Sequence, residues 1–520
     1  MSEGIKIKRA LLSCWDKIGL AEFASELRKW KIEIISSGGT AEYLQNNGIP
    51  VTTVEEITGF PSLLEGRVKT LHPNIHAAIL AKRTPEHLQQ LKDLGINPID
   101  LVVVNLYPFL QAVSEKKLSQ DEMIELIDIG GPTLLRAAAK NHNYVVPIFN
   151  PAQYSTVIES LKENKGSIPR DLSRQFCTEA FYYTAYYDSQ ISRYFDGLER
   201  DESLPERLSL FFQKKSDLRY GENPHQAAAL YRPLFSEQDN ISEPRQLWGK
   251  EMSYNNYIDV ISAAELIREF SEPTVAIIKH TNPCGIASRT TIREAFIRAL
   301  AGDPLSAFGG IIASNRAIDL ETAEEIHKSF YECVIAPDYG QEALKVLQKK
   351  KNLRILQNMP NIEDTVKTEV KFLPFGILMQ DKDIIDLNLN ELVSVGAREP
   401  ENKERSDLFF AWKVVKHVKS NAIVYVRNNQ LLGVGAGQMS RVDAVKLAGV
   451  KAKEAGHSLD NTVMASDAYF PFRDGIDEAA KAGIRAVIQP GGSIRDQEVI
   501  DAVKEYNMAM LLTGIRHFKH

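Results

Sequence analysis

The chain of 520 residues contains few cysteines, no excess of positive charge and no long apolar run. Its four cysteines include no C-x-x-C pair, which excludes a disulfide framework and is typical of a reducing, cytoplasmic environment. The 62 Lys and Arg residues are outnumbered by 68 Asp and Glu residues, and this net charge of -6 argues against a nucleic-acid partner. The most apolar segment, residues 101–110, is far shorter than the ~20 apolar residues of a membrane span. Because no signal peptide is recognisable, we expect a cytoplasmic protein with neither a membrane nor a nucleic-acid partner.

Hydrophobic periodicity predicts an α/β fold. Residues 6–13, 31–36 and 99–106 are short apolar runs that predict strands, and the last is apolar enough for a parallel strand covered on both faces. Residues 20–27 carry apolar side chains at helical spacing between the first two strands. Alternation of strands and helices is typical of a layered domain with a parallel sheet.

A charged segment with a proline, residues 201–215, predicts a boundary near residue 211. Strand-helix alternation continues beyond it, and the length of that second region, about 310 residues, predicts two subdomains. We therefore expect an α/β core in residues 1–150, a helical extension and linker in residues 151–211, and a second α/β region in residues 212–520.

A polar, glycine-rich segment, Ser36–Thr40, follows a predicted strand and precedes a helix predicted over residues 41–47. Free N–H groups at a helix N-terminus, approached closely through glycine, suit a phosphate. The alternative is a plain turn in which Thr40 is the N-cap of the helix. The Gly-Lys-Ser/Thr ending of a P-loop is absent.

A second polar segment, residues 66–73, carries two cations. Arg67 and Lys69 alternate, so on an extended backbone they face the same way, either as an anion clamp or as two solvated side chains. His72 and His76 share a helical spacing, but no third ligand is near, so zinc is not expected.

Other polar residues of the first region follow a strand or flank a glycine turn. Asn105 and Tyr107 come at the carboxyl end of a predicted buried strand, the edge at which open parallel sheets bind ligands. Asp128 precedes a Gly-Gly pair, and Lys140 follows three alanines. Taken singly, Lys140 is equally compatible with a solvated surface.

In the second region, Lys279 and His280 end an apolar strand predicted over residues 274–279. A histidine can accept a proton from a weak nucleophile near neutral pH, and a neighbouring ammonium can stabilise an oxyanion. The alternative is a strand-end histidine satisfied by the backbone. Cys284 is a candidate nucleophile, but the second cysteine of the zinc-deaminase pattern is absent.

Taken together, these segments resemble the bifunctional purine-biosynthesis family that combines aminoimidazole-carboxamide ribotide (AICAR) formyltransferase with inosine monophosphate (IMP) cyclohydrolase. The resemblance covers nearly the whole chain. Its segments, in order, are residues 12–13, 37–40, 66–73, 105–108, 219–221, 279–285, 470–474 and 515–520.

The resemblance implies a methylglyoxal-synthase-like cyclohydrolase domain at the N-terminus, followed by a transformylase region of two cytidine-deaminase-like subdomains. It implies 10-formyltetrahydrofolate as a co-substrate, no required metal and a homodimer. Whether a monovalent cation is also bound is left open.

The resemblance also implies roles for individual residues. In formyl transfer, His280 is the base and Lys279 stabilises charge or supplies a proton; in cyclisation, Lys140 is the acid or base. Lys69, Tyr107 and Asp128 assist Lys140. The implied substrate-binding residues are Ser13, Lys17, Ser37, Gly38, Gly39, Thr40, Arg67, Thr70 and Asn105 in the first region, and Arg219, Tyr220, Gly309, Asn421, Arg441, Tyr469, Asp474, Ser493 and Arg516 in the second.

One departure from the family pattern is Trp15, which stands where a small hydroxyl residue is usual. It leaves open the reading in which only the formyltransferase is active. Two further alternatives are a nucleotide deaminase, which needs a zinc ligand set, and a nucleotide- or RNA-binding module without catalysis.

Overall fold

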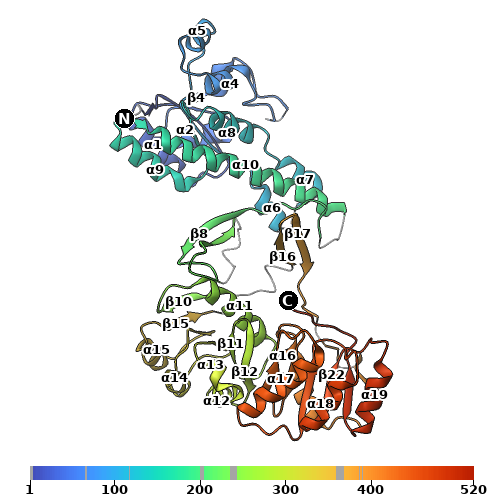
Figure 1. Cartoon of the computed structure of the whole chain (residues 1–520). Coiled ribbons are helices and arrows are strands. Elements are labelled where there is room, and N and C mark those ends of the chain that lie inside the picture. Colours follow the sequence, from blue (N-terminus) through green and yellow to red (C-terminus); the bar gives the residue numbers. More distant parts are fainter. Residues whose placement is uncertain are drawn as a thin grey trace. The chain divides into compact units, whose positions relative to one another are not determined.

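The computed structural model describes residues 4–64, 67–115, 118–199, 204–234, 243–358, 368–385, 387–388 and 391–520. The chain forms two compact units, Met1–Phe211 (unit 1) and Phe212–His520 (unit 2). Both alternate strands and helices, as predicted (Figure 1). Within the described ranges, no helix combines the length and the apolar character needed to cross a lipid bilayer.

Unit 1 is built on a parallel five-stranded sheet. In spatial order its strands are β4 (Thr52–Thr53), β3 (Glu33–Ser36), β2 (Arg9–Cys14), β5 (Leu101–Asn105) and β6 (Val146–Ile148); β1 (Ile5–Lys6) pairs separately with β7 (Ser167–Ile168). The chain runs from β2 to one edge of the sheet and then returns to build the other edge. The carboxyl ends of β2 and β5 therefore border the crevice at which such sheets bind ligands.

Helices cover both faces of this sheet, because alternate residues of each strand point to opposite sides. Leu12 and Val103 belong to one core, and Leu11 and Val102 to the other. The first core includes α1 (Leu20–Lys29), α2 (Gly38–Asn46) and α9 (Tyr154–Glu163), and the second includes α4 (Pro73–Leu80), α5 (Pro85–Asp93) and α8 (Gly130–Lys140). The long helix α10 (Arg170–Glu199) adds side chains to both cores, and the shorter helices are α3 (Val54–Thr58), α6 (Phe109–Glu115), α7 (Gln120–Glu125) and the 3-10 turn Pro151–Gln153. The helices after residue 150 thus complete unit 1.

Unit 2 contains two six-stranded sheets with the same strand order and the same directions. Sheet 1 consists of β10 (Arg245–Trp248), β15 (Arg354–Gln357), β14 (Cys333–Ala336), β13 (Ile311–Ser314), β11 (Thr274–Lys279) and β12 (Asn282–Ser288). Sheet 2 consists of β18 (Val393–Ser394), β23 (Ala509–Leu512), β22 (Ile484–Gln489), β21 (Thr462–Ser466), β19 (Ile423–Val426) and β20 (Leu431–Gly435). In both, an antiparallel hairpin adjoins three parallel strands and an antiparallel edge strand.

The helices of unit 2 form an inner and two outer layers. The inner core contains α11 (Tyr254–Arg268) and α16 (Asn402–Val415), which pack against residues of both sheets. The outer face of sheet 1 is covered by α12 (Ile292–Gly302), α14 (Leu320–His327) and α15 (Gln341–Gln348), and that of sheet 2 by α17 (Arg441–Glu454), α18 (Asp474–Ala482) and α19 (Asp496–Glu505) (Figure 1). Helix α13 (Pro304–Ala307) and the hairpins β8 (Phe212–Leu218)–β9 (Ala228–Pro233) and β16 (Thr368–Leu373)–β17 (Gly376–Asp381) complete the unit.

Candidate active sites

In unit 1, the loop after β2 is held against the ends of two neighbouring elements. The Asn105 side chain, at the end of β5, accepts a hydrogen bond from the Asp16 N–H at 2.8 Å and donates one to the Asp16 carbonyl at 3.0 Å. The Thr40 hydroxyl, in α2, donates to the Cys14 carbonyl at 2.8 Å and accepts from the Cys14 N–H at 3.1 Å. Lys17 Nζ donates to Thr40 Oγ1 at 3.2 Å, and burial lowers the pKa of this ammonium. These bonds place Lys17 beside the first turn of α2.

The N-terminus of α2 and Lys69 form a positively charged recess. Gly38 has a φ of +51°, and a Cβ built on it would lie 2.7 Å from Lys69 Nζ, so the ammonium rests over this glycine. The Ser37 hydroxyl does not cap the helix, and a Cβ on Gly39 would meet no atom within 4 Å. Open space beside a helix N-terminus and an ammonium suits a phosphate. The alternative with Thr40 as the N-cap is wrong, because α2 already begins at Gly38.

Asp128 and Tyr107 lie together at the same edge of the sheet. The Asp128 carboxylate accepts hydrogen bonds from the Gly131 N–H at 2.8 Å and from the backbone of Tyr107. Burial raises the pKa of Asp128 in spite of these bonds. Burial and the charge of Asp128 raise the pKa of Tyr107 as well. Trp15 lies edge-on to the Tyr107 ring, with 5.2 Å between the ring centroids. An acid and a phenol therefore lie close together, both partly buried.

The other residues predicted for unit 1 are placed differently. Thr70 Oγ1 lies over Gly130, 2.9 Å from the position of a Cβ there, which brings it to the start of α8. Ser13 is half-buried within β2. Arg67 forms an ion pair with Glu125 in which both side chains are exposed, so its guanidinium stays accessible to an anion; Gly66 lies outside the described residues. Lys140 is exposed at the far end of α8, ~15 Å along the helix axis from its first residue.

In unit 2, the β11–β12 turn presents the predicted base. His280 is exposed, and both His280 and Thr281 have left-handed backbone conformations, with φ values of +50° and +63°. Asp259, from α11, accepts a hydrogen bond from the Thr281 N–H at 2.7 Å, and burial raises the pKa of this carboxyl. Lys279 Nζ donates to the Phe308 carbonyl at 2.8 Å, next to Gly309. The turn therefore presents an imidazole and an ammonium on consecutive residues, the first exposed and the second half-buried.

Cys284 lies four residues after His280 but is not a nucleophile in this structure. Its thiol donates a hydrogen bond to the Ile277 carbonyl at 3.3 Å. Burial raises its pKa to about 12, so the thiol stays protonated at neutral pH.

A hydrogen-bonded network joins this turn to sheet 2. The Asn282 side-chain oxygen accepts from the Lys419 N–H at 3.0 Å. Two residues further on, the Asn421 side-chain oxygen accepts from Arg441 at 2.8 Å, and Arg441 forms a buried ion pair with Asp467. Asn421 and Arg441 are thus bonded to each other, and Arg441 Nε is among the buried side-chain atoms of the described chain that have no hydrogen-bond partner.

The remaining residues predicted for unit 2 fall into two groups. Tyr469, Asp474, Ser493 and Arg516 follow β21, β22 or β23, so they share the carboxyl edge of sheet 2 with Asn421. The C-terminal tail is fixed there, since Ser420 and Lys519 exchange two hydrogen bonds of 3.0 and 3.1 Å. Arg219 and Tyr220 form a separate pair after β8, with the guanidinium carbon 5.4 Å from the ring centroid, and within the described ranges no bond links this pair to His280.

Sequence reasoning missed Asp259, Asn282 and Asp467, which hold the predicted residues in place. For Asp259 the available signal was an acid inside a predominantly apolar stretch of helix, and such acids are common on exposed helix faces. Among the residues that the structure places, no group of three or more His, Cys, Asp and Glu side chains is arranged to hold a metal ion.

Comparisons with known proteins agree with the resemblance. The model of the AICARFT/IMPCHase bienzyme family matches residues 138–451, and that of the MGS-like domain matches residues 19–133. The bifunctional purine biosynthesis protein PurH of Caldicellulosiruptor saccharolyticus is 50% identical over 99% of this chain and 100% of its own. The PurH of Bacillus cereus strain B4264 is 49% identical over the same shares. A solved structure, the crystal structure of ForH, has 31% identity and a TM-score of 0.33 over 36% of this chain and 99% of that one. The chain therefore belongs to the AICARFT/IMPCHase bienzyme family, the bifunctional AICAR formyltransferases and IMP cyclohydrolases.

Proposed function

We propose that unit 2 carries out formyl transfer and unit 1 carries out ring closure, the last two steps of IMP synthesis. In the first step the amine of AICAR attacks the formyl carbon of 10-formyltetrahydrofolate, and the bond from that carbon to folate N10 breaks. The amine loses a proton and N10 gains one. In the second step the carboxamide nitrogen attacks the new formyl carbon, and the formyl oxygen leaves as water.

The His280 turn carries the first half of the proposal. The AICAR amine is a poor nucleophile, because its ring and carboxamide withdraw the nitrogen lone pair, so a base must remove its proton as the bond forms. His280 is exposed and stands on a turn fixed by Asp259, which gives it access and a defined position. Lys279, tied to the Phe308 carbonyl, is the adjacent group for charge on the formyl oxygen or for a proton to N10.

We assign ribotide and folate binding to the surroundings of this turn. Gly309 adjoins the Lys279 contact, and Asn421, Arg441, Tyr469, Asp474, Ser493 and Arg516 lie along the edge of sheet 2. Arg219 and Tyr220 are not bonded to the His280 turn within the described chain, so we propose that a homodimer brings such groups together across two copies.

The recess at the N-terminus of α2 supports the second half of the proposal, ring closure in unit 1. Lys69, Lys17 and the N–H groups of Ser37–Thr40 would hold the phosphate of the formylated ribotide. Asp128 and Tyr107, whose pKa values are both raised, would orient the carboxamide and move the proton that leaves it. The reacting atoms already belong to one molecule, so orientation contributes most of the rate. Lys140 keeps the acid-base role that the family implies, although it ends α8 away from this recess.

Two properties complete the proposal. The formyl donor is 10-formyltetrahydrofolate, used as a co-substrate and not as a bound group. We place the enzyme in the cytoplasm, since all four cysteines are free thiols.

Product analysis tests the proposal. The full chain, given AICAR and 10-formyltetrahydrofolate, should form IMP. Lys69→Ala should instead accumulate formyl-AICAR, because only the second step uses that recess. Lys140→Ala tests the role that the family implies for Lys140. Accumulation of formyl-AICAR would assign Lys140 to cyclisation, and unchanged IMP formation would exclude that role. Formation of IMP by His280→Ala at the normal rate would contradict the assignment of unit 2.

A further inference from the structure

Two hairpins of unit 2 are built alike. One joins β11 to β12 and the other joins β19 to β20, at the same position in two sheets of identical order. The two central residues of each turn have φ values between +50° and +63°, and in both a cation precedes them and a side-chain amide follows. The turns are Lys279-His280-Thr281-Asn282, called the His280 hairpin, and Arg427-Asn428-Asn429-Gln430, called the Asn428 hairpin.

A carboxylate at an equivalent position supports each turn. Asp259 is the sixth residue of α11 and accepts the Thr281 N–H at 2.7 Å. Asp407 is the sixth residue of α16 and accepts the N–H groups of Asn428 and Asn429 at 2.9 and 2.6 Å. Each turn thus stands on an acid contributed by the inner helix of its own repeat, half-buried at Asp259 and buried at Asp407.

The cation before each turn is also fixed in the same way. Lys279 Nζ donates to the Phe308 carbonyl at 2.8 Å, just before β13, and an Arg427 guanidinium nitrogen donates to the Asp460 carbonyl at 2.9 Å, just before β21. β13 and β21 occupy equivalent places in the two sheets. The Asn428 hairpin is therefore the repeat counterpart of the proposed formyl-transfer turn, with an amide in place of the imidazole.

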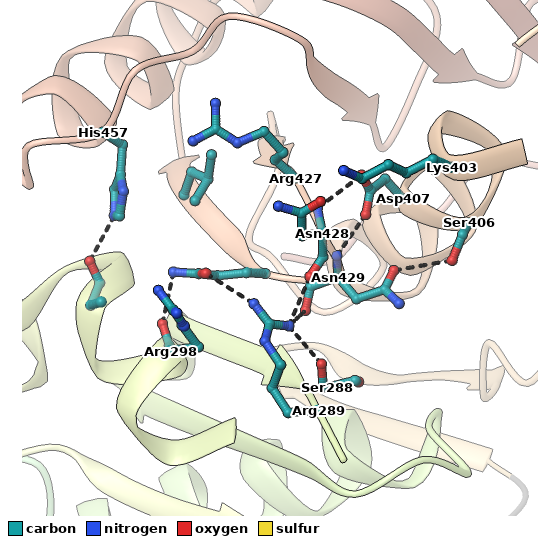
Figure 2. Close-up of a pocket in the computed structure, with 13 residues that line it drawn as sticks. Ser288, Arg289, Arg298, Lys403, Ser406, Asp407, Arg427, Asn428, Asn429 and His457 are labelled. Atoms are coloured by element: carbon teal, nitrogen blue, oxygen red, sulfur yellow. Dashed lines mark hydrogen bonds between the residues drawn. The ribbon is translucent and has the colours of Figure 1, made fainter. Parts of the chain in front are cut away.

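A cavity of about 590 Å³ adjoins the Asn428 hairpin and lies between the two repeats (Figure 2). Four cationic side chains and a single carboxylate line it, which gives a net charge of +3 with His457 neutral. The carboxylate, Asp407, is already occupied by the turn. Arg289 is occupied as well, because its guanidinium donates to the carbonyls of Ser288 and Asn428 at 2.6 and 2.7 Å.

Arg298, Lys403 and Arg427 are the other three cations; Arg427 already donates to the Asp460 carbonyl at 2.9 Å, and the charge of Lys403 acts on Asp407. None of the three forms an ion pair within the described residues, and Arg298 and Lys403 are exposed to solvent. They come from both repeats, as the ribbon colours in Figure 2 show, so they line the cavity from more than one side. Converging unpaired cations repel each other unless an anion lies between them.

We propose that this cavity is a second, non-catalytic binding site of unit 2, specific for a small phosphomonoester. Guanidinium and ammonium groups together favour a phosphate dianion. The volume exceeds that of phosphate alone and falls within the range of small-molecule pockets, so the ligand carries a sugar-sized group as well. No Phe, Tyr or Trp lines the cavity, so it offers a base no large aromatic ring to stack on. The comparison of the Asn428 hairpin with a formyl-transfer site rests on the proposed function. The proposal that the cavity binds a phosphomonoester does not.

Asn428 determines what the site does. A side-chain amide neither accepts nor releases a proton near neutral pH, so the bound phosphomonoester is held without being converted. The site is therefore expected to bind compounds by their phosphate and with little regard to the base.

Calorimetric titration of the full chain with ribose 5-phosphate tests the proposal. The double variant Arg298→Ala/Lys403→Ala removes two exposed cations that have no hydrogen-bonded partner among the described residues. It should weaken one binding event per chain by ~10–100-fold, as expected for lost charged hydrogen bonds. The control Lys446→Ala, an exposed cation on α17 outside the cavity, should leave that event unchanged. IMP should bind there within a few-fold of ribose 5-phosphate, and ribose should not compete.

Four results would overturn the proposal. The first is an unchanged titration of the double variant, and the second and third are competition by ribose or by inorganic phosphate as strong as that by ribose 5-phosphate. The fourth is a double variant that loses its oligomeric state but keeps every binding event. Thermal unfolding and formyl transfer by the double variant show whether it is folded. His280→Ala should keep this binding event while losing formyl transfer, so a failure of the proposed function is told apart from a failure of the second site.

Discussion

The two candidate active sites differ in how many elements contribute to them. In unit 1 the groups come from the ends of β2 and β5 and from the first turns of α2 and α8, and the carboxyl of Asp128 is half-buried. In unit 2 the predicted base stands exposed on a single hairpin, supported from beneath by Asp259. Ring closure within one molecule depends on orientation, whereas formyl transfer between two molecules depends on a base. The difference in construction therefore matches the difference in chemistry.

The largest effect should come from removing the lone base. His280→Asn should lower formyl transfer by ~10²–10⁴-fold, the usual contribution of a positioned base. Asparagine tolerates the left-handed conformation of this turn and reproduces the Asn428 hairpin, so the fold should be kept. Cyclisation of added formyl-AICAR should be unchanged. Measuring both steps in one preparation checks this, and a formyl-transfer rate within ~10-fold of wild type would contradict it.

Asp128→Asn should separate activity from stability in unit 1. Cyclisation should fall by ~10²–10³-fold, since an amide cannot move the proton. Burial raises the pKa of Asp128, so the carboxylate's contribution to stability is greatest below its unfolded pKa and declines as pH rises through the folded pKa. The variant should therefore gain stability relative to wild type between about pH 4 and pH 7. Urea unfolding of unit 1 at both pH values checks this. A variant that loses stability relative to wild type as the pH rises would refute it.

Neighbouring glycines give a sharper test of the phosphate recess. Gly38→Ala forces a Cβ onto Lys69 Nζ in a conformation with a φ of +51°, so it should lower the stability of unit 1 by ~1–2 kcal/mol and cyclisation by ~10–100-fold. Gly39→Ala meets no protein atom, so stability should be unchanged. Its KM for formyl-AICAR should still rise, because the methyl group occupies the space assigned to the phosphate. An unchanged KM in Gly39→Ala would move the phosphate elsewhere.

The sequence predicted the fold better than the sites. An apolar, β-branched run identified the strand at residues 274–279 residue for residue, because burial on both faces imposes its composition. The start of α2 was misplaced to Ala41, since a Gly-Gly pair is typical of a turn and only packing against the Cys14 loop makes it helical.

Long-range contacts were beyond sequence reasoning. Arg67 is paired with a glutamate 58 residues away, and Lys140 is separated from Asp128 by the length of a helix. The likeness of the His280 and Asn428 hairpins was hidden too, because the two turns share charge, amide and backbone conformation but no residue at the same position.

Trp15→Ser should have the smallest effect. It tests whether cyclisation in unit 1 depends on the loop after β2 as well as on the ends of the strands. Trp15 is 52% exposed, and its ring packs edge-on against Tyr107, a contact worth ~0.5–1.5 kcal/mol. The Asp16 backbone stays bonded to Asn105 without it, so Lys17 keeps its place. Cyclisation should therefore change by no more than ~10-fold, through a freer Tyr107 ring, and formyl transfer should not change. Trp15→Phe, which keeps an aromatic neighbour, should lie between Trp15→Ser and wild type. A collapse of cyclisation in Trp15→Ser, rescued by Trp15→Phe, would instead make the aromatic ring itself part of the site.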